Sequence, residues 1–440
     1  MCFLSWLSGK GSADFQVFLI DSCRYNKNTM QHFNSAQKRV LPIGLSVALA
    51  LFGDLSLFTV LVTQLEVTRL TLVQVGILLS IHRFIRIPLN PLVGLLQDHL
   101  GRRILFIIGL VLAVVSTFLY SVSAGFVPFL FSRILWGTAW ALINVGGRTM
   151  TLDLSTPSNR GRLTGIYNTF VWLGFAVGPA LGGRLTDTIG FRSAMLICAA
   201  IAAVALLITV FLVSETRPHS NLAATGRITW RTYLNRLNPF SGNREIMKAQ
   251  ILLAVFMFAG DGVVLSTLTL LLRERLGGVV PFLGSLVGIA TFSGSLFAMR
   301  SVAAALISPL AGRLADRFGK KPMLAGFFLL AIVSYLMIGF SRTQAALAVS
   351  AVLTAFSGGA ILVLLMALIG DHTHDSTGAA MGKFAMMGDL GSSIGPALAM
   401  VLIPLIGISR VYSISAILFL LCTVFLFIPL QSQAESLAQE

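Results

Sequence analysis

Long runs of apolar residues alternate with short polar segments along most of the chain, beginning near residue 40. A helix needs about 20 apolar residues to cross the hydrocarbon core of a bilayer. Twelve runs have this character, near residues 41–64, 71–95, 104–124, 128–149, 163–183, 193–213, 249–272, 284–310, 322–340, 345–369, 379–403 and 410–430. The pattern predicts an all-α membrane protein with twelve transmembrane helices.

A polar stretch near the middle of the chain divides the predicted helices into two groups of six. We expect a cytoplasmic N-terminal segment at 1–40, six-helix bundles at 41–213 and 249–430, a cytoplasmic linker at 214–248 and a cytoplasmic tail at 431–440. The first residues make a poor signal peptide, because Lys10, Gly11 and Asp14 interrupt their apolar character. Met30 is an alternative start of the chain.

Composition indicates lipid as the main surroundings of this chain. Hydrophobic residues make up 56% of it and charged residues only 11%, whereas soluble domains carry about 25% charged residues. The net charge of +15 would suit a partner of nucleic acid, but the basic residues lie in short loops and form no basic face. We therefore exclude nucleic acid as a partner. The four cysteines lie far apart, which suggests neither a metal site nor a disulfide framework.

The basic residues also predict the orientation in the membrane. If both termini are cytoplasmic, the inward segments carry roughly three times as many lysines and arginines as the outward loops, as the positive-inside rule requires. We therefore expect a multi-pass protein of the cytoplasmic (inner) membrane with both termini in the cytoplasm.

The two halves repeat each other. The segment from Gly94 to Arg103 follows the second predicted helix, and a matching segment from Gly312 to Lys321 follows the eighth, 218 residues later. Their shared positions are Gly94, Asp98, Gly101, Arg102 and Arg103 in the first copy and Gly312, Asp316, Gly319, Lys320 and Lys321 in the second, which also has Arg317 where the first has His99. Parallel repeats of six helices build one large transporter fold.

With these motifs the sequence resembles the major facilitator superfamily from about Val40 to Leu430. The resemblance implies two pseudo-symmetric six-helix bundles that move a small solute by alternating access. It also implies that the loop motifs latch the cytoplasmic side shut in the outward-facing state. Simple anchoring by positive charge is the plainer reading of the same basic residues, and the two readings are compatible.

The fifth and eleventh predicted helices indicate which group of the superfamily the sequence resembles. The fifth contains Gly174, Gly178, Pro179, Gly182 and Gly183, and the eleventh contains Gly391, Gly395 and Pro396 at matching places. The fifth resembles the pattern of drug:proton antiporters, and Arg133-x3-Gly137-x3-Ala141 in the fourth is similar to the motif assigned there to proton coupling. Small residues also permit close helix contact in lipid, so packing alone is the alternative interpretation.

Charged residues within the predicted helices are candidate functional groups, because an ionised side chain at the bilayer centre costs at least about 2.5–3.5 kcal/mol. We expect Asp54, Asp261, Asp389 and Arg133 to serve proton coupling, with Asp54 first since Asp54 and Asp261 occupy matching places in the two halves. Arg83, Arg86 and Arg300 are the candidate substrate-binding residues, since guanidinium groups bind carboxylate and phosphate. Ion pairs that only hold the bundle together are the alternative.

These observations predict a secondary transporter that exports an amphipathic or anionic small molecule in exchange for protons, as a monomer and without a cofactor. A proton symporter that imports an organic anion, such as a metabolite or siderophore, is the alternative, favoured by the arginines of the second helix. A membrane receptor or sensor is a third possibility. No nucleotide-binding loop, metal cluster or nucleophile constellation is present in the sequence, so an enzyme is not expected.

Overall fold

The computed structural model describes residues 13–156, 159–216, 244–371 and 377–428; within these, the side chains of 13–35, 98–99, 161, 370–371 and 377–382 lie outside the description. Residues 1–12 of the predicted N-terminal segment at 1–40, the predicted tail at 431–440 and most of the linker at 214–248 therefore lie outside the described residues. The described part is helical apart from one hairpin and short connections.

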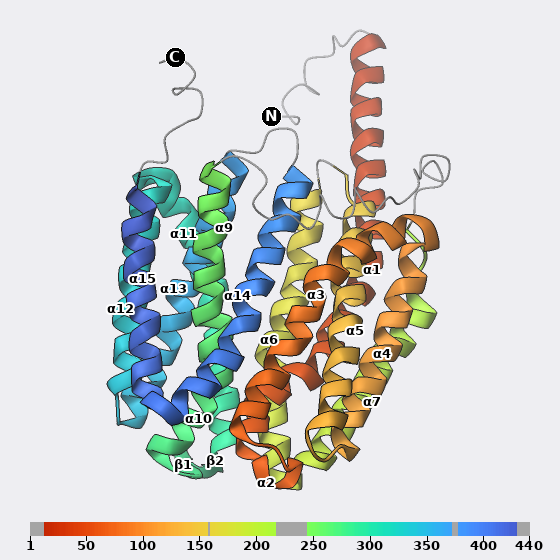
Figure 1. Cartoon of the computed structure of the whole chain (residues 1–440). Coiled ribbons are helices and arrows are strands. Elements are labelled where there is room, and N and C mark those ends of the chain that lie inside the picture. The colour runs from red at the N-terminus through yellow and green to blue at the C-terminus, as the bar shows by residue number, and fades with distance from the viewer. Residues whose placement is uncertain (1–12, 157–158, 217–243, 372–376, 429–440) are drawn as a thin grey trace, which may run out of the picture.

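Six long helices form the N-terminal bundle, and two short helices, η1 (Leu61–Thr63) and α2 (Leu65–Thr68), link the first to the second. The long helices are α1 (Ala13–Val60), α3 (Leu72–Leu100), α4 (Arg102–Val122), α5 (Phe126–Asp153), α6 (Arg160–Ile189) and α7 (Phe191–Leu212). The first predicted span is thus the second half of a 48-residue helix that begins at Ala13. The two bundles stand side by side in Figure 1.

The C-terminal bundle repeats this arrangement with an interrupted first helix. That helix consists of α9 (Arg244–Met257), the π-helical turn η3 (Phe258–Val264) and α10 (Leu265–Leu276). It is followed by β1 (Val279–Phe282), β2 (Ser285–Gly288), α11 (Ile289–Phe318), α12 (Lys320–Phe340), α13 (Gln344–Asp371), α14 (Thr377–Ile406) and α15 (Ile408–Phe427). The prediction of an all-α membrane fold with two six-helix bundles is confirmed.

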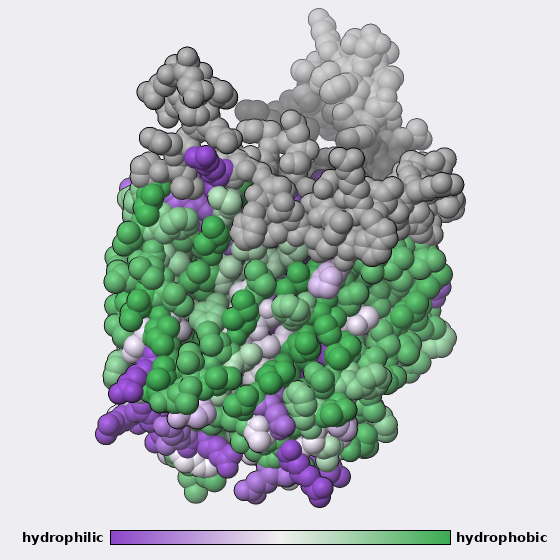
Figure 2. Space-filling model, viewed as in Figure 1, coloured by the Kyte–Doolittle hydropathy of each residue, from purple (hydrophilic) through white to green (hydrophobic). Residues whose placement is uncertain are grey.

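Eleven helices of the described part are long and apolar enough to cross a membrane by length and composition. The remaining long helix, α6, has 30 residues but includes glycines, a proline and charged residues that lower its apolar character. It packs mainly against α1 and α11, and its residues Gly174, Gly178, Gly182 and Gly183 are buried. On the face shown in Figure 2, apolar residues cover the flank of the bundle and polar residues gather at the end that carries the hairpin.

The hairpin corrects one predicted boundary. Residues 284–288 were expected to start the eighth membrane helix, but they contain β2, which pairs antiparallel with β1 so that Val280 faces Val287. Leu283 (φ 50°) and Gly284 (φ 80°) form a two-residue turn with both residues in the left-handed region, which suits a tight hairpin. A short apolar run does not distinguish a strand from a helix, and the β-branched valines favour the strand.

We call the end of the bundle with the turns at Gly101 and Gly319 the motif end, and the opposite end, with β1 and β2, the hairpin end. Both glycines have φ near 90°, a conformation that glycine adopts without strain, and each joins two helices directly. The two halves meet along α3 and α14 and along α6 and α11.

The halves are in close contact at the hairpin end. A Cβ atom added to Gly183 of α6 would lie 2.1 Å from the carbonyl oxygen of Ala290 on α11, and one added to Gly294 would lie 2.2 Å from that of Pro179. Asp187 of α6 accepts hydrogen bonds from the backbone N–H (2.7 Å) and the hydroxyl (2.6 Å) of Thr291 in α11. Glycine permits this backbone approach between the halves.

The motif end of the same helices is less crowded. A Cβ atom added to Gly94 of α3, Gly165 of α6 or Gly312 of α11 would meet no described atom within 4 Å. Within the described residues, α6 and α11 are therefore in close backbone contact at the hairpin end, whereas the space beside these three glycines at the motif end is open.

Candidate functional site

A polar cluster centred on Arg133 lies inside the N-terminal bundle. The Arg133 side chain is fully buried and donates a hydrogen bond to the Asp54 carboxylate; Asp54 retains 7% exposure. Its other donors reach the carbonyl of Leu78 (2.9 Å), the hydroxyl of Tyr120 (3.2 Å) and Nδ1 of His82. A guanidinium group only donates, so Nδ1 of His82 accepts and the ring proton lies on Nε2. The cluster joins α1, α3, α4 and α5.

Two further ion pairs cross between the halves. Nη1 of Arg83 on α3 lies 3.3 Å from Oδ2 of Asp261 in η3, and Nη2 of Arg86 contacts Oδ1 of Asp389 on α14. Asn90, one helical turn further along α3, donates from Nδ2 to Oδ2 of Asp389 at 3.1 Å. Arg83 and Arg86 lie three residues apart on one face of α3, as expected from helical periodicity. They bind carboxylates on two different helices of the other half.

The carboxylates of these pairs differ in access to solvent. The Asp261 side chain is 42% exposed and that of Asp389 is 16% exposed. Arg83 also lies with its guanidinium carbon 5.3 Å from the ring centre of Phe58, whose ring faces Arg133 at 5.7 Å as well. Phe58 is 2% exposed, so it packs between two cations and is not free to stack on a solute.

Arg300 on α11 has a different environment. Its Nη1 donates to the carbonyl of Ala351 at 2.7 Å and to the hydroxyl of Thr354, both on α13. Among the described residues, no carboxylate lies within ion-pair distance of Arg300. The structure thus brings Arg83 and Arg86 together and places Arg300 in the C-terminal bundle.

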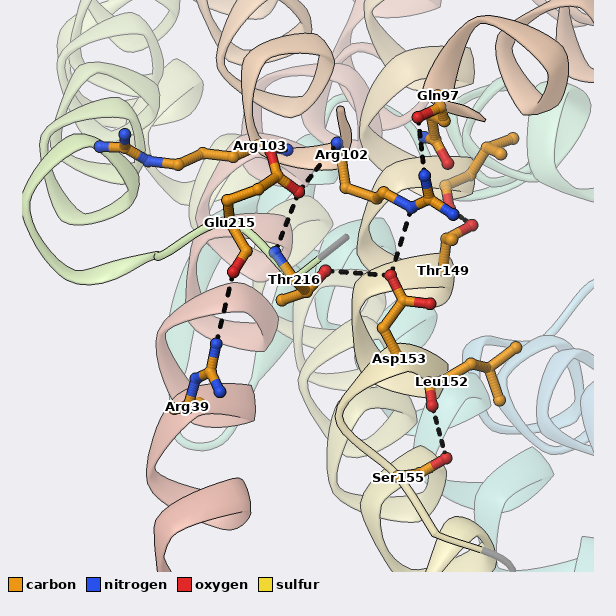
Figure 3. A network of polar contacts seen from close by, with 11 residues as sticks. Arg39, Gln97, Arg102, Arg103, Thr149, Leu152, Asp153, Ser155, Glu215 and Thr216 are labelled. Atoms are coloured by element: carbon orange, nitrogen blue, oxygen red, sulfur yellow. Dashed lines mark hydrogen bonds and ion pairs between the residues drawn. The ribbon is translucent and has the colours of Figure 1, made fainter. Parts of the chain in front are cut away.

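The loop motif at Gly101 is held by Glu215, which follows α7 (Figure 3). Glu215 accepts hydrogen bonds from the backbone N–H groups of Arg102 and Arg103, both at 3.1 Å, at the first turn of α4. A carboxylate at a helix N-terminus contributes about 0.3–1 kcal/mol. Nε of Arg102 lies 3.2 Å from Oδ2 of Asp153 at the end of α5. The named contacts stay within the N-terminal bundle, and the Asp98 side chain lies outside the described residues.

The second loop motif has simpler contacts. Lys321 pairs with Glu245 at 3.3 Å, and Lys320 donates to the carbonyl of Ala367 at 3.3 Å. Arg317 lies over the ring of Phe318. Asp316 is exposed, and the described residues give it no hydrogen-bond or ion-pair partner.

The glycines of α6 and α14 pack mainly against their own halves. Gly174, Gly178 and Gly182 face α1, and Gly391 and Gly395 face α9 and η3, whereas Gly183 faces α11 of the other half. The carbonyl of Pro396 approaches Gly76 of α3, also across the interface. The glycine-rich helices α6 and α14 therefore pack closely against α1 and η3, and they meet the opposite half near the hairpin end.

Sequence reasoning did not identify Asn90, His82 or Glu215 as partners in these networks. Asn90 lies four residues after Arg86, so helical spacing alone would have placed it on the same face. His82 lies near the middle of its predicted span, but its contact with Arg133 depends on the packing of α3 against α5. Glu215 begins a segment that reads as linker, and no local pattern links it to α4.

Comparisons with known proteins agree with this architecture. The profile described as Major Facilitator Superfamily matches residues 43–299 and 252–439. A protein named "Multidrug resistance protein MdtG" from Dickeya zeae (strain Ech586) is 24% identical over 343 residues, covering 78% of this chain and 80% of that protein.

Two solved structures share the fold. A bacterial homologue of the human lysosomal transporter Spinster, inward-facing and unoccupied, has a TM-score of 0.73 at 14% identity, covering 89% of this chain and 96% of that chain. The human organic anion transporter MFSD10 has a TM-score of 0.67 at 21% identity, covering 89% of this chain and 99% of that chain. The resemblance inferred from the loop and glycine motifs is confirmed. The chain belongs to the Major Facilitator Superfamily and is a multi-pass membrane transporter, not an enzyme.

Proposed function

We propose that this protein exports small amphipathic or anionic molecules in exchange for protons, by alternating access. The proposal rests on two ion pairs, Arg83–Asp261 and Arg86–Asp389, which join the two halves in the interior. Opening at the hairpin end requires α3 to move away from η3 and α14, so it breaks both pairs. Separating the more buried pair, Arg86–Asp389, leaves an uncompensated buried charge at a cost of about 3–5 kcal/mol, whereas Arg83–Asp261 costs less because the Asp261 side chain is 42% exposed.

Protonation of the aspartate carboxylates lowers the cost of separating these ion pairs. A protonated Asp261 or Asp389 no longer holds its arginine by charge, so the halves can part, and an anionic solute can take over the arginine. We rank these two aspartates ahead of Asp54 as proton carriers. Asp54 and Arg133 belong to the same bundle and remain together when the halves separate.

The proposed position in the cell follows the distribution of lysine and arginine. We propose the cytoplasmic membrane, both termini in the cytoplasm, and a functional monomer. The motif end then faces the cytoplasm, and close packing at the hairpin end makes this conformation inward-facing. In the outward-facing state, Gly94, Asp98, Gly101 and the basic residues of both loop motifs close the motif end. The multidrug-resistance relative supports export.

Import of an organic anion with protons is the second candidate. It is favoured by four arginines inside the bundles against three aspartates, and by the human organic anion transporter of the same fold. Both candidates share the fold, the proton carriers and the arginines, and differ in the direction of solute movement.

Everted membrane vesicles with an acidic lumen distinguish the two. The probes are naphthoate, naphthylmethanol and naphthylmethylamine, which share a ring system and differ in charge. An exporter accumulates its probe in the lumen, whereas an importer releases preloaded probe from it. Asp261→Asn and Asp389→Asn should abolish gradient-driven movement and preserve probe exchange without a gradient. Normal gradient-driven accumulation by both variants would exclude these aspartates from proton coupling.

A further inference from the structure

The polar sites of the two bundles occupy matching positions. The loop motifs place Gly101 and Gly319 in equivalent positions, and the same offset relates His82 to Arg300 and Arg133 to Ala351. In the N-terminal bundle, His82 contacts Arg133. In the C-terminal bundle, Arg300 contacts the backbone of Ala351. Each bundle therefore places one guanidinium at this point, from α5 in the first and from α11 in the second.

The two guanidinium groups differ in how completely they are bound. Arg133 has four hydrogen-bond partners, including the Asp54 carboxylate, and is fully buried. Arg300 uses only Nη1, and the described residues offer no acceptor to its Nε and Nη2 groups. Neither atom is among the fully buried polar atoms without a partner, so each keeps some accessible surface.

Asp261 is the carboxylate that would complete the second site. It matches Asp54 in its place along the first helix of each bundle, and it interacts electrostatically with Arg300. Its ion pair, however, is with Arg83 of the other half. It lies in the π-helical turn η3 between Gly260 and Gly262, and single π-helical turns inside α-helices are frequent at functional sites.

We propose that Arg300 is the subsite for the anionic group of the transported solute, with a carboxylate occupying the place that Asp54 takes beside Arg133. Asp261 competes for this place, so its binding to Arg83 leaves Arg300 available. The phenol groups of Tyr335 and Tyr412 also interact electrostatically with Arg300, and their rings lie 6.1 Å apart. Both tyrosines are buried, at 2% and 0% exposure, so the subsite selects for the carboxylate of the solute and not for its apolar part. This inference rests on the proposed transport function and narrows its substrate class.

Arginine labelling tests the subsite without transport. Phenylglyoxal modifies accessible guanidinium groups, and peptide mass spectrometry measures the extent at each arginine of the purified full chain in detergent. Arg300 should be modified and Arg133 protected. Naphthoate should protect Arg300, whereas naphthylmethylamine and naphthylmethanol should not. If naphthoate gives no protection of Arg300, or the amine protects equally, the subsite is wrong.

The affinity of Arg300 variants for naphthoate is a second test of the subsite. Arg300→Gln should weaken naphthoate binding about tenfold or more, the loss expected for a charge-assisted fork contact. Arg300→Lys keeps the charge without the fork and should lie in between. Arg342→Gln, an exposed residue after α12, is the matched control and should bind as the wild type does. Equal affinity in Arg300→Gln and the control would overturn the proposal. These measurements need no gradient, so lack of proton coupling would overturn only the proposed function.

Discussion

At the scale of single residues, the arginines inside the bundles differ in what they hold together. Arg133 on α5 binds three other helices of the same half, whereas Arg83 and Arg86 bind carboxylates of the other half. The first arrangement stabilises a rigid body. The second must break whenever the halves move apart, so these pairs depend on the conformational state and the Arg133 cluster does not.

Replacing Arg133 should destabilise the folded protein more than replacing an exposed arginine. Arg133→Ala leaves the Asp54 carboxylate buried without its partner, and removing one member of a buried pair costs about 3–5 kcal/mol. Unfolding of the purified protein in detergent measures the loss. Adding Asp54→Asn should restore part of it, because no unpaired charge remains.

Arg184→Ala is the control for this prediction, since Arg184 is exposed on α6. An exposed substitution usually changes stability by about 0.5 kcal/mol or less. Similar losses in Arg133→Ala and Arg184→Ala would show that the Arg133 cluster contributes no special stability.

The sequence predicted which charged residues lie inside the spans, but not how they pair. A charged residue within an apolar span is costly in the membrane, so the sequence identifies Asp54, Asp261 and Asp389 as candidates for a functional role or an ion pair. The choice between a partner in the same half and one in the other half depends on how the bundles pack. Arg83 and Arg86 share one predicted role, substrate binding, and lie on one face of α3, yet each contacts a different aspartate.

At the scale of elements, small residues decide where the two halves can touch. Gly183 and Gly294 allow the backbones of α6 and α11 to meet at the hairpin end, and the same two helices have free space near Gly165 and Gly312. One helix pair therefore has a closed end and a less crowded end.

Adding one methyl group should open the closed end. In Gly183→Ala the new Cβ would lie 2.1 Å from a backbone oxygen of Ala290, which no side-chain rotation relieves, so α6 and α11 must separate. Spin labels at Ile189 and Leu286, in a cysteine-free background, should show longer distances than the parent.

Gly165→Ala is the matched control on the same helix, because its Cβ would meet no described atom within 4 Å. It should leave the distance distribution unchanged. A closed end that tolerates Gly183→Ala without any change would mean that close backbone contact does not hold it.

Hydropathy predicted the helices well and the interruptions poorly. Long apolar runs determine membrane helices because every backbone polar group in lipid needs an internal partner. The β1–β2 hairpin at 279–288 lies at the end of the bundle, where the backbone is not confined to lipid. In the sequence, its short apolar strands cannot be distinguished from the start of the next helix. The π-helical turn around Asp261 lies inside one continuous helical run, so hydropathy gives no sign of its altered hydrogen bonding.

At the scale of the whole molecule, the first question is which end faces the cytoplasm. Leu283 at the tip of the hairpin is 89% exposed, and Arg160 at the start of α6 is exposed at the motif end. With the motif end inside, a membrane-impermeant maleimide should label Leu283→Cys in intact cells. It should label Arg160→Cys only after permeabilisation. The reverse result would invert the proposed orientation.

Asp187 should control the balance between the two access states. Its carboxylate accepts two hydrogen bonds from Thr291 in the first turn of α11, so a residue of one half caps a helix of the other. Loss of an N-terminal cap typically costs about 1 kcal/mol, and the helix dipole adds to the preference for an anion there. This energy is present only while the hairpin end is closed, because opening carries α6 away from α11.

Asp187→Ala should therefore shift the equilibrium toward the state open at the hairpin end, by roughly fivefold for about 1 kcal/mol. The same pair of spin labels at Ile189 and Leu286 measures the two populations. Thr291→Val removes only the hydroxyl donor and should give a smaller shift. Thr188→Ala is the control, since the hydroxyl of Thr188 bonds only to carbonyls of its own helix. If Asp187→Ala and Thr188→Ala give the same populations, the cap does not hold the hairpin end shut. Closure there would then depend on the glycine contacts of α6 with α11 and on the two central ion pairs.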